Sequence, residues 1–373
     1  MQKKYTSLGL MSGTSGDGVD ASLITSNGLN EYDVIKDKYF EYDIEIYKEI
    51  HSLKENIINL KDLKKFSDEL TNLERKITLF HAKVIKEFEV HCDDFLVGFH
   101  GQTIYHNAKE KNSTQLGDGK LLNQLTKKKI IYNFRKNDIL NGGEGAPLAP
   151  LFHQLIVSQN KIKLPVCILN IGGISNISII KKPINSLDFF SKDIGPGNCL
   201  IDNWVRKNST KKFDKDGNLA LSGKKNDIIY EQAQELYANR INKEKLSLDV
   251  NDFDVSFARG LSLEDGAATL TDFTASIIGE ELMTSLLNLN QEIQNVLVCG
   301  GGRKNKILLR KIKKKLPQKT NIKLIDNFGI DGDFVESQAF AFLSIRSIQN
   351  LPISFPNTTG CIKPCTGGEL VEN

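Results

Sequence analysis

Apolar residues recur along the chain with two spacings, and each spacing predicts a type of element. Short apolar runs on either side of a glycine-rich segment, at residues 5–10 and 19–25, favour a strand, a tight turn and a second strand. The same pattern returns at residues 166–170 and 177–180, around a second pair of glycines. No short repeat period accompanies this recurrence, so the pattern predicts two related halves rather than a solenoid.

Longer segments carry helical spacing. From Phe66 to Phe88, apolar residues recur at steps of three and four, which predicts a long amphipathic helix with one face in the core. Shorter patterns predict helices at about residues 268–282, 305–316 and 336–349, and buried strands at residues 95–99, 130–134 and 296–299. Because strands alternate with helices in each half, mixed α/β layers are expected.

Length and composition limit the class of protein. At 373 residues the chain exceeds what one core usually holds, so two domains are expected, residues 1–150 and 151–373, with a cleft between them. The last helix could pack back on the first domain. Lys and Arg number 49 against 46 Asp and Glu, so the charge predicts neither a nucleic-acid partner nor a membrane partner.

Cysteine usage and hydropathy predict a location. The six cysteines form no CxxC pair, and Cys167 and Cys299 lie in apolar strand-like runs, which favours free thiols in a reducing cytoplasm. The N-terminus shows no signal-peptide core. The longest uncharged stretch, residues 165–180, is interrupted by polar residues and is shorter than the roughly 20 apolar residues of a membrane span. A soluble cytoplasmic protein is therefore expected.

Three glycine-rich segments could bring backbone groups close to a ligand. Residues 12–18 place three glycines among small polar residues, which suits a phosphate cradle, although the run is not a Walker A sequence and a plain hairpin turn is the alternative. Residues 172–176 offer a second cradle. Residues 300–302 follow a strand, either as a tight turn or as a place where the backbone approaches a flat ligand such as adenine.

Polar residues near predicted strands are candidates for chemistry. Asp193, in a predicted rigid turn, could take a proton from an attacking hydroxyl or water, or could cap the following helix. Arg135 could bind an acidic substrate or pair with Asp138. His100 could belong to the site or be a hydrogen-bonded histidine at a strand end.

These segments belong to a series of motifs that spans nearly the whole chain. In order they are MSGTSGDGVD (11–20), HGQT (100–103), NFR (133–135), GGEGAPL (142–148), LNIGGISNI (169–177), DIGPGN (193–198), EDGAATLT (264–271), CGGG (299–302) and ESQAFA (336–341). Any one of them is weak by itself, but their number and order resemble those of anhydro-N-acetylmuramic acid kinases.

The resemblance implies an α/β fold of the actin, Hsp70 and hexokinase type, which is ribonuclease H-like, with duplicated mixed-sheet halves and ATP in the cleft between them. It implies that Asp193 activates a water that opens the 1,6-anhydro bridge, while the freed O6 attacks the γ-phosphate. The product would be N-acetylmuramic acid 6-phosphate, made in peptidoglycan recycling.

The resemblance also assigns candidate residues. Those for the nucleotide are Ser12, Gly13, Thr14, Ser15, Asp17, Gly18, Asn170, Gly172, Gly173, Gly195, Gly197, Asn198, Gly300, Gly301 and Gly302. Those for the sugar are His100, Gln102, Thr103, Arg135 and Glu336. Arg135 could pair with the lactyl carboxylate. Asp17 could hold Mg²⁺ through water, since this cation keeps much of its hydration shell. A homodimer is also implied.

The chain departs from the family pattern at four positions, Gly16, Glu144, Ile194 and Arg303, which bear on affinity more than on reaction type. One alternative function is a kinase for another sugar, because shared architecture does not fix the acceptor. A second alternative is an ATP-driven binding protein like actin or Hsp70, although the chain has no long extra segment for a peptide-binding domain.

Overall fold

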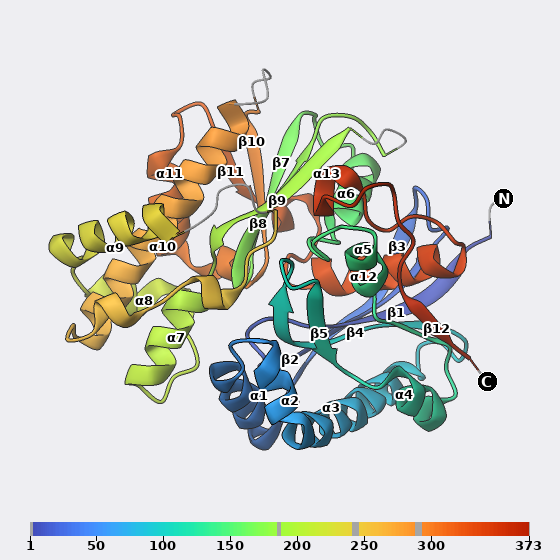
Figure 1. Cartoon of the computed structure of the whole chain (residues 1–373). Coiled ribbons are helices and arrows are strands. Elements are labelled where there is room, and N and C mark those ends of the chain that lie inside the picture. The colour runs from blue at the N-terminus through green and yellow to red at the C-terminus, as the bar shows by residue number, and fades with distance from the viewer. Residues whose placement is uncertain (1–2, 185–187, 241–245, 288–292, 373) are drawn as a thin grey trace. The chain divides into compact units, whose positions relative to one another are not determined.

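The computed structural model describes residues 3–184, 188–240, 246–287 and 293–372 (Figure 1). Contacts within the chain divide it into two compact units. Unit 1 comprises Met1–Ile162, Lys182–Phe190 and Asp333–Asn373, and unit 2 comprises Lys163–Lys181 and Ser191–Gly332. The N-terminal and C-terminal segments therefore belong to the same unit. Among the described residues, no helix combines the length and the apolar character needed to cross a membrane.

Unit 1 is built on a seven-stranded mixed sheet. Its strands are β1 (Tyr5–Ser12), β2 (Gly18–Ser26), β3 (Tyr32–Glu41), β4 (Leu96–Asn107), β5 (Asn112–Leu116), β6 (Ile130–Tyr132) and β12 (Glu369–Val371). The strand order is β12-β6-β4-β1-β2-β3, and β5 pairs with β4. Strands β1 and β2 form the predicted antiparallel hairpin, and β4 runs parallel to β1.

Unit 2 repeats this topology in a five-stranded sheet of order β11-β10-β7-β8-β9. Its strands are β7 (Val166–Ile171), β8 (Ile174–Ile180), β9 (Phe189–Pro196), β10 (Asn295–Cys299) and β11 (Asn321–Leu324). Strands β7 and β8 form the second predicted hairpin, and β10 runs parallel to β7. The order β3-β2-β1-β4-β6 in unit 1 matches β9-β8-β7-β10-β11 in unit 2, which confirms the predicted actin-like α/β architecture of duplicated mixed sheets.

The predicted helices are present, although the one expected at residues 268–282 extends five residues further at each end. Unit 1 contains α1 (Ile44–Asn56), α2 (Leu60–Lys65), α3 (Ser67–Phe88), α4 (Gly119–Thr126), α5 (Lys136–Leu140), α6 (Pro150–Gln159), α12 (Val335–Ile348) and α13 (Pro356–Thr359). Unit 2 contains α7 (Cys199–Asn208), α8 (Asn218–Ser222), α9 (Asp227–Arg240), α10 (Leu263–Leu287) and α11 (Lys306–Lys315). The periodic segment from Phe66 to Phe88 is α3, whose apolar face is buried as expected.

The two faces of the unit 1 sheet pack against different helices. Large apolar residues of β1, β2 and β4 form a core with α1 and α3. Some of the alternate positions are small: the hydroxyls of Ser7 on β1 and Ser344 on α12 share a hydrogen bond of 2.6 Å. A Cβ atom at Gly9 would lie only 1.9 Å from the Ser337 carbonyl oxygen. Helix α12, the last long helix, therefore packs directly on the strands of unit 1 (Figure 1).

Strand β4 is longer than the sequence predicted. The predicted strand ended at Phe99, but β4 continues to Asn107 because β5 pairs antiparallel with its second half. Gly101 has a φ of 75°, and the ladder to β1 is irregular nearby, which interrupts the apolar pattern. The segment His100 to Thr103 therefore lies within a strand and not at its end.

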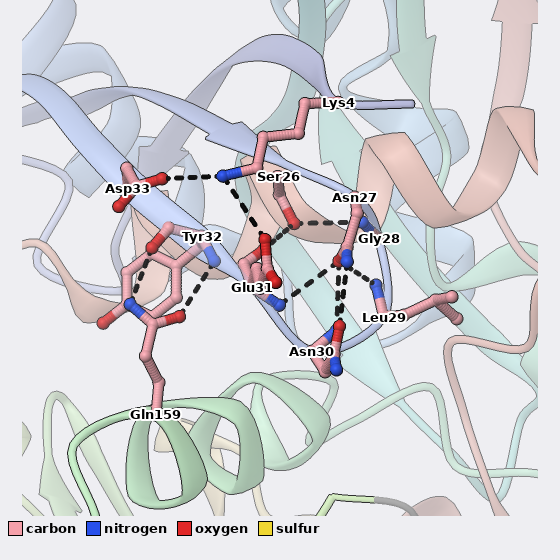
Figure 2. Close-up of polar contacts among 10 residues, drawn as sticks. All are labelled: Lys4, Ser26, Asn27, Gly28, Leu29, Asn30, Glu31, Tyr32, Asp33 and Gln159. Carbon is pink, nitrogen blue, oxygen red and sulfur yellow. Dashed lines mark hydrogen bonds and ion pairs between the residues drawn. The ribbon is translucent and has the colours of Figure 1, made fainter. Parts of the chain in front are cut away.

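Side chains hold the turn between β2 and β3 (Figure 2). The carboxamide oxygen of Asn27 accepts hydrogen bonds of 2.9 to 3.2 Å from three backbone amides, those of Leu29, Asn30 and Glu31. Gln159 of α6 bonds both backbone groups of Tyr32. Arg346 of α12 donates to the carbonyl oxygen of Gly28 at 2.7 Å. The edge hairpin of the sheet is thus tied to two helices that follow much later in the chain.

Candidate active site

The first glycine loop, residues 13–17 between β1 and β2, is held by its carbonyl oxygens. The Gly13 carbonyl oxygen accepts from the Gly16 amide at 3.1 Å and from Nε2 of Gln102 at 3.0 Å. The Thr14 carbonyl oxygen accepts from Nζ of Lys54 at 2.8 Å. Residues of α1 and β4 therefore turn these carbonyls toward the protein.

The last residue of this loop is held in the same way. The Asp17 carbonyl oxygen accepts from the Tyr42 amide at 2.9 Å and from the Tyr39 hydroxyl at 3.0 Å. The Asp17 side chain accepts from the Ser15 hydroxyl at 2.5 Å. The amides of Thr14 and Ser15 have no acceptor within the described part of the chain. A loop whose carbonyls are bound while its amides are available is suited to an anion.

Ser12 precedes this loop and faces the core. Its side chain is 1% exposed, and its hydroxyl lies 2.8 Å from the Tyr42 hydroxyl and 3.3 Å from Nε2 of His81. Nδ1 of His81 lies 2.8 Å from the Ile77 carbonyl oxygen, so Nδ1 carries the proton and Nε2 accepts from Ser12. Burial lowers the pKa of His81 to about 4. Ser12 thus supports the loop from its core side.

Gln102 contains a buried acceptor beside the first glycine loop. Its Nε2 donates to the carbonyl oxygens of Gly13 and Thr103, at 3.0 and 3.3 Å, so the opposite atom of the amide is the oxygen. This Oε1 is buried and has no partner among the described residues. A Cβ atom at Gly16 would lie 3.8 Å from it. Since an unpaired buried acceptor costs about 1–3 kcal/mol, this oxygen suits a donor such as a bound water.

The second glycine loop, residues 172–173 between β7 and β8, is built on the same plan. The Gly172 carbonyl oxygen accepts from the Asn198 amide at 2.8 Å. The Gly173 carbonyl oxygen accepts from the amides of Gly197 and Cys199, at 2.8 and 3.2 Å. In unit 2 the residues at the start of α7 donate to the loop carbonyl oxygens, as Lys54 of α1 and Gln102 of β4 do in unit 1. The carbonyl oxygens of both loops therefore face protein donors.

Asp193 lies on β9, where the sequence predicted a rigid turn. Strand β9 pairs with β8 and continues to Pro196, and the Asp193 amide donates to the Leu246 carbonyl oxygen at 2.8 Å. The side chain is 9% exposed, and its Oδ2 accepts from the Leu248 amide at 2.8 Å. The N-cap position of α7 is occupied by Asn198, whose side chain makes no capping hydrogen bond. Asp193 is therefore not a helix cap, and its carboxylate is held in one orientation.

The third glycine segment, residues 300–302, packs against the end of β7. Gly300 has a φ of 78°, and a Cβ atom there would lie 2.4 Å from Oδ1 of Asn170. A Cβ atom at Gly301 would meet nothing within 4 Å. Gly300 is thus required by the packing and the backbone conformation, whereas Gly301 presents bare backbone to open space.

Arg303 anchors this glycine segment. Its side chain is 5% exposed, and Nε and Nη2 each donate to the Asp326 carboxylate at 2.9 Å. Further bonds of 3.3 Å reach Asp331 and the Gly300 carbonyl oxygen. The guanidinium lowers the pKa of Asp326. Arg303 therefore ties the glycine segment to the segment after β11.

On unit 1, Arg135 and His100 are in direct contact. Arg135 follows β6, and its Nε and Nη2 donate to Nε2 of His100 at 3.2 and 3.0 Å. Nδ1 of His100 bonds the Gly101 carbonyl oxygen at 2.8 Å, and the ring packs on Phe340 with centroids 4.5 Å apart. Burial, and then the charge of Arg135, lower the pKa of His100 to about 3.

Asp138, the other candidate partner of Arg135, is bonded elsewhere. Its carboxylate accepts from the Thr359 hydroxyl at 2.6 Å and from the Gly145 amide at 2.7 Å. The Glu144 amide donates to the Thr359 carbonyl oxygen at 2.8 Å. Asp138 thus organises the loop at residues 142–148, one of the motifs that the sequence analysis singled out.

The other sugar-side candidates lie on β4 and α12. Glu336 is in the first turn of α12, four residues before Phe340, so it shares the helix face whose aromatic ring contacts His100. Thr103 on β4 accepts from Nε2 of Gln115 at 3.3 Å. Unit 1 therefore brings His100 and Arg135 together and places Glu336 on the adjoining helix face.

Each unit carries its own share of the candidate residues. Unit 1 holds Ser12 to Gly18 and the five sugar-side residues, and unit 2 holds Asp193, the second loop with residues 195–198, and the Gly300 segment. The sequence analysis missed the residues that hold these segments in place, namely Tyr39, Tyr42, Lys54, His81 and Asp326. For His81 a signal existed, because it lies four residues after Ile77 on the apolar face of α3.

Comparison with known proteins finds one family model and several similar chains. A family model described as anhydro-N-acetylmuramic acid kinase matches residues 5–373. The chain is 53% identical to a protein of that name from Pelagibacter ubique and 35% identical to one from Agrobacterium fabrum, each over 100% of both chains. A solved structure, the activator of 2-hydroxyisocaproyl-CoA dehydratase from Clostridium difficile with bound ADPNP, aligns with a TM-score of 0.40 at 14% identity, over 92% of this chain and 96% of that chain.

Proposed function

Because the chain belongs to the anhydro-N-acetylmuramic acid kinase family, we propose that it phosphorylates O6 of 1,6-anhydro-N-acetylmuramic acid with ATP while water opens the anhydro bridge. The product is N-acetylmuramic acid 6-phosphate, and the reaction serves peptidoglycan recycling. The observation that carries the proposal is the common construction of the two glycine loops, since protein donors bind the carbonyl oxygens of both.

ATP, when bound, supplies the phosphoryl group that is transferred. The residues present fit it, because both loops offer amide nitrogens and few carbonyl oxygens, as phosphate oxygens require. In this proposal the amides of Thr14 and Ser15 bind phosphate from unit 1, and the amide of Gly173 does so from unit 2. The bare backbone at Gly301 suits the flat adenine ring.

Asp193 is the general base in this proposal. The bond from C1 to O6 breaks as water oxygen bonds to C1, and O6 then bonds to the γ-phosphorus as the bond to the ADP oxygen breaks. The bridging oxygen is both leaving group and nucleophile, so the proton that needs an acceptor is that of the water. The Leu248 amide fixes Oδ2 of Asp193, which orients the carboxylate for this transfer.

The sugar is proposed to bind through Thr103, Arg135 and Glu336. Arg135 is the candidate for the lactyl carboxylate, because a guanidinium can donate two parallel hydrogen bonds to a carboxylate. Its side chain is half-buried, which strengthens such a pair relative to one in bulk water. The resemblance of the surrounding motifs supports Thr103 and Glu336.

We further propose that Asp17 holds Mg²⁺ through water. The fit rests on two oxygen ligands at the first glycine loop. They are the Asp17 carboxylate and Oε1 of Gln102, which has no partner among the described residues and can accept from a metal-bound water. Among the described residues, no three His, Cys, Asp or Glu side chains form a metal-binding group. A cation bound mainly by water, with one carboxylate nearby, agrees with the preference of Mg²⁺ for its hydration shell.

A homodimer in the cytoplasm completes the proposal. The family resemblance supports the dimer, and the dependence on ATP together with free cysteines supports the location. Light scattering after size-exclusion chromatography should give twice the mass of the 41.7 kDa chain. A mass of one chain at micromolar concentration would contradict the dimer without affecting the kinase assignment.

Incubation of the purified protein with MgATP and the anhydro-sugar tests the main proposal. Mass spectrometry should find a product heavier than the substrate by one phosphoryl group (HPO3) and one water. A panel of free N-acetylmuramic acid, N-acetylglucosamine and glucose serves as the comparison. If the anhydro-sugar stays unchanged while one of these gains a phosphate, the acceptor assignment is wrong. Slow ATP hydrolysis that no sugar affects would favour a binding protein instead.

A further inference from the structure

The contacts of His100 fix its tautomer. Nδ1 lies 2.8 Å from the Gly101 carbonyl oxygen, and a carbonyl oxygen only accepts, so Nδ1 carries the proton. Nε2 then presents a lone pair, and both Nε and Nη2 of Arg135 donate to it. This arrangement requires a neutral ring, because a proton on Nε2 would face the guanidinium with a second positive charge.

The local sequence builds this orientation. The Gly101 φ of 75° directs its carbonyl oxygen to the neighbouring imidazole, and a side chain at this position would lie 2.6 Å from the Leu116 carbonyl oxygen. Glycine after histidine is therefore needed both for the backbone conformation and for the approach of β5. The histidine ring is thereby held at both nitrogen atoms.

A shared aromatic contact fixes the position of Arg135 relative to His100. Phe340 of α12 packs on the His100 ring at 4.5 Å and on the Phe134 ring at 5.2 Å, measured between centroids. Phe134 is 2% exposed and immediately precedes Arg135. Phe340 thus positions both Phe134, which precedes Arg135 in the backbone, and His100, which accepts from the Arg135 guanidinium.

We propose that His100 is a positioning residue, which as the neutral Nδ1–H tautomer holds the guanidinium plane of Arg135 for a carboxylate of the substrate. The inference rests on the proposed function, in which that carboxylate is the lactyl group. Arginine side chains lose much conformational freedom on binding, and an arginine held in advance loses less. His100 therefore acts through Arg135 and does not itself touch the sugar.

Two substitutions separate this role from simple packing. His100→Phe keeps an aromatic ring against Phe340 but removes both nitrogens, whereas His100→Gln can return an acceptor near the position of Nε2. We expect His100→Phe to raise KM for the anhydro-sugar about 10- to 100-fold, the size of a charge-assisted hydrogen bond. The value of kcat should change less than about threefold, as for lost uniform binding, and His100→Gln should recover part of the KM loss.

A double-mutant cycle with Arg135→Leu gives the decisive comparison. If His100 acts through Arg135, His100→Phe adds nothing to KM in the Arg135→Leu background. His100→Phe alone should also leave KM unchanged when the lactyl carboxylate of the substrate is replaced by an amide. Additive effects in the cycle, or an equal KM increase for the amide, would overturn the proposal.

A measurement on the protein without substrate provides an independent check. Long-range ¹H–¹⁵N spectra at pH 7 should show His100 as the Nδ1–H tautomer, with the signal assigned by its loss in His100→Gln. An Nε2–H tautomer or an imidazolium would contradict the proposal, even where the phenylalanine variant does not fold. If the wild-type protein leaves the anhydro-sugar unchanged, the proposed function fails and the role of His100 fails with it. If the wild type is active but the effects in the double-mutant cycle are additive, only the role proposed for His100 is refuted.

Discussion

The carboxylate of Asp193 accepts a hydrogen bond of 2.8 Å from the backbone amide of Leu248, 55 residues later in the chain. Asp193→Asn keeps the size of the side chain but cannot take a proton. The variant should bind ATP and sugar and lose turnover by about 10²- to 10⁴-fold. Calorimetry would measure binding, and a coupled ADP assay would measure turnover.

Two comparisons support the interpretation of that loss. Asp188→Asn, at a carboxylate 40% exposed and paired with Lys182, should keep wild-type turnover. In ¹⁸O-water the wild type should place the label on the anomeric carbon, because water attacks the sugar and O6 attacks phosphorus. Label in the phosphate group, or near-normal turnover of the Asn variant, would remove Asp193 from the role of base.

The glycine segment allows a test in which neighbouring substitutions behave differently. Gly300→Ala forces a side chain into a φ of 78° and against Asn170, so it should destabilise the protein by about 1–3 kcal/mol. Gly301→Ala meets no atom within 4 Å and should leave stability within about 0.5 kcal/mol of wild type. If adenine lies on this segment, Gly301→Ala should nevertheless raise KM for ATP. Urea unfolding and initial-rate kinetics measure the two effects.

Removal of the Arg303 guanidinium should destabilise unit 2. Arg303→Met is expected to cost about 2–3 kcal/mol, below the value of about 3–5 kcal/mol for a fully buried pair, because the Asp326 side chain is 37% exposed. Lys38→Met, which breaks an exposed pair with Glu87, should cost less than about 1 kcal/mol. If both variants lower the free energy of unfolding equally in urea, the pair of Arg303 with Asp326 is no more stabilising than an exposed pair.

Three buried histidines predict a loss of stability in acid. Burial lowers the pKa of His81 and His153 to about 4 and that of His100 to about 3, from a usual value of 6.5. Between pH 6.5 and 4 the unfolded chain binds protons that the folded chain does not, so stability falls as pH falls. Each histidine contributes a slope of up to about 1.4 kcal/mol per pH unit.

His153→Gln removes one of these groups and should reduce the slope by about a third relative to wild type. Urea unfolding at pH 7, 6 and 5 measures it. All three histidines lie in unit 1, so the loss should appear in that unit's transition. Unfolding free energies that do not change from pH 7 to 5 would contradict the burial of these three rings in the neutral form.

Local patterns predicted most elements of the fold. Glycine between apolar runs identified both hairpins, and the spacing from Phe66 to Phe88 identified α3, because these signals depend on near neighbours. The length of β4 was not predictable in this way, since its second half depends on pairing with β5 across an irregular step at Gly101. The turn expected around Asp193 was wrong because this residue lies in β9, and pairing of β9 with β8 outweighed the local glycine and proline signal.

The site was predictable as segments and less so as individual side chains. A motif such as HGQT does not reveal that Gln102 faces the first glycine loop while His100 faces Arg135. Ser12 lies in a glycine-rich motif, yet its hydroxyl is buried against Tyr42 and His81. Which way a side chain points is decided by partners from other elements, and single-sequence patterns do not contain that information.

Unit 1 is completed by the C-terminal segment of the chain, and this order has a consequence for synthesis on the ribosome. Every residue of unit 2 is translated before residue 333, whereas the sheet of unit 1 waits for α12, which follows that residue. For most of translation the growing protein therefore holds one face of its first sheet uncovered. That face carries Ser7 and Gly9 but also Ile24 and Leu96, the strand partners of Ser7, so the nascent chain keeps some apolar surface exposed there until α12 is made.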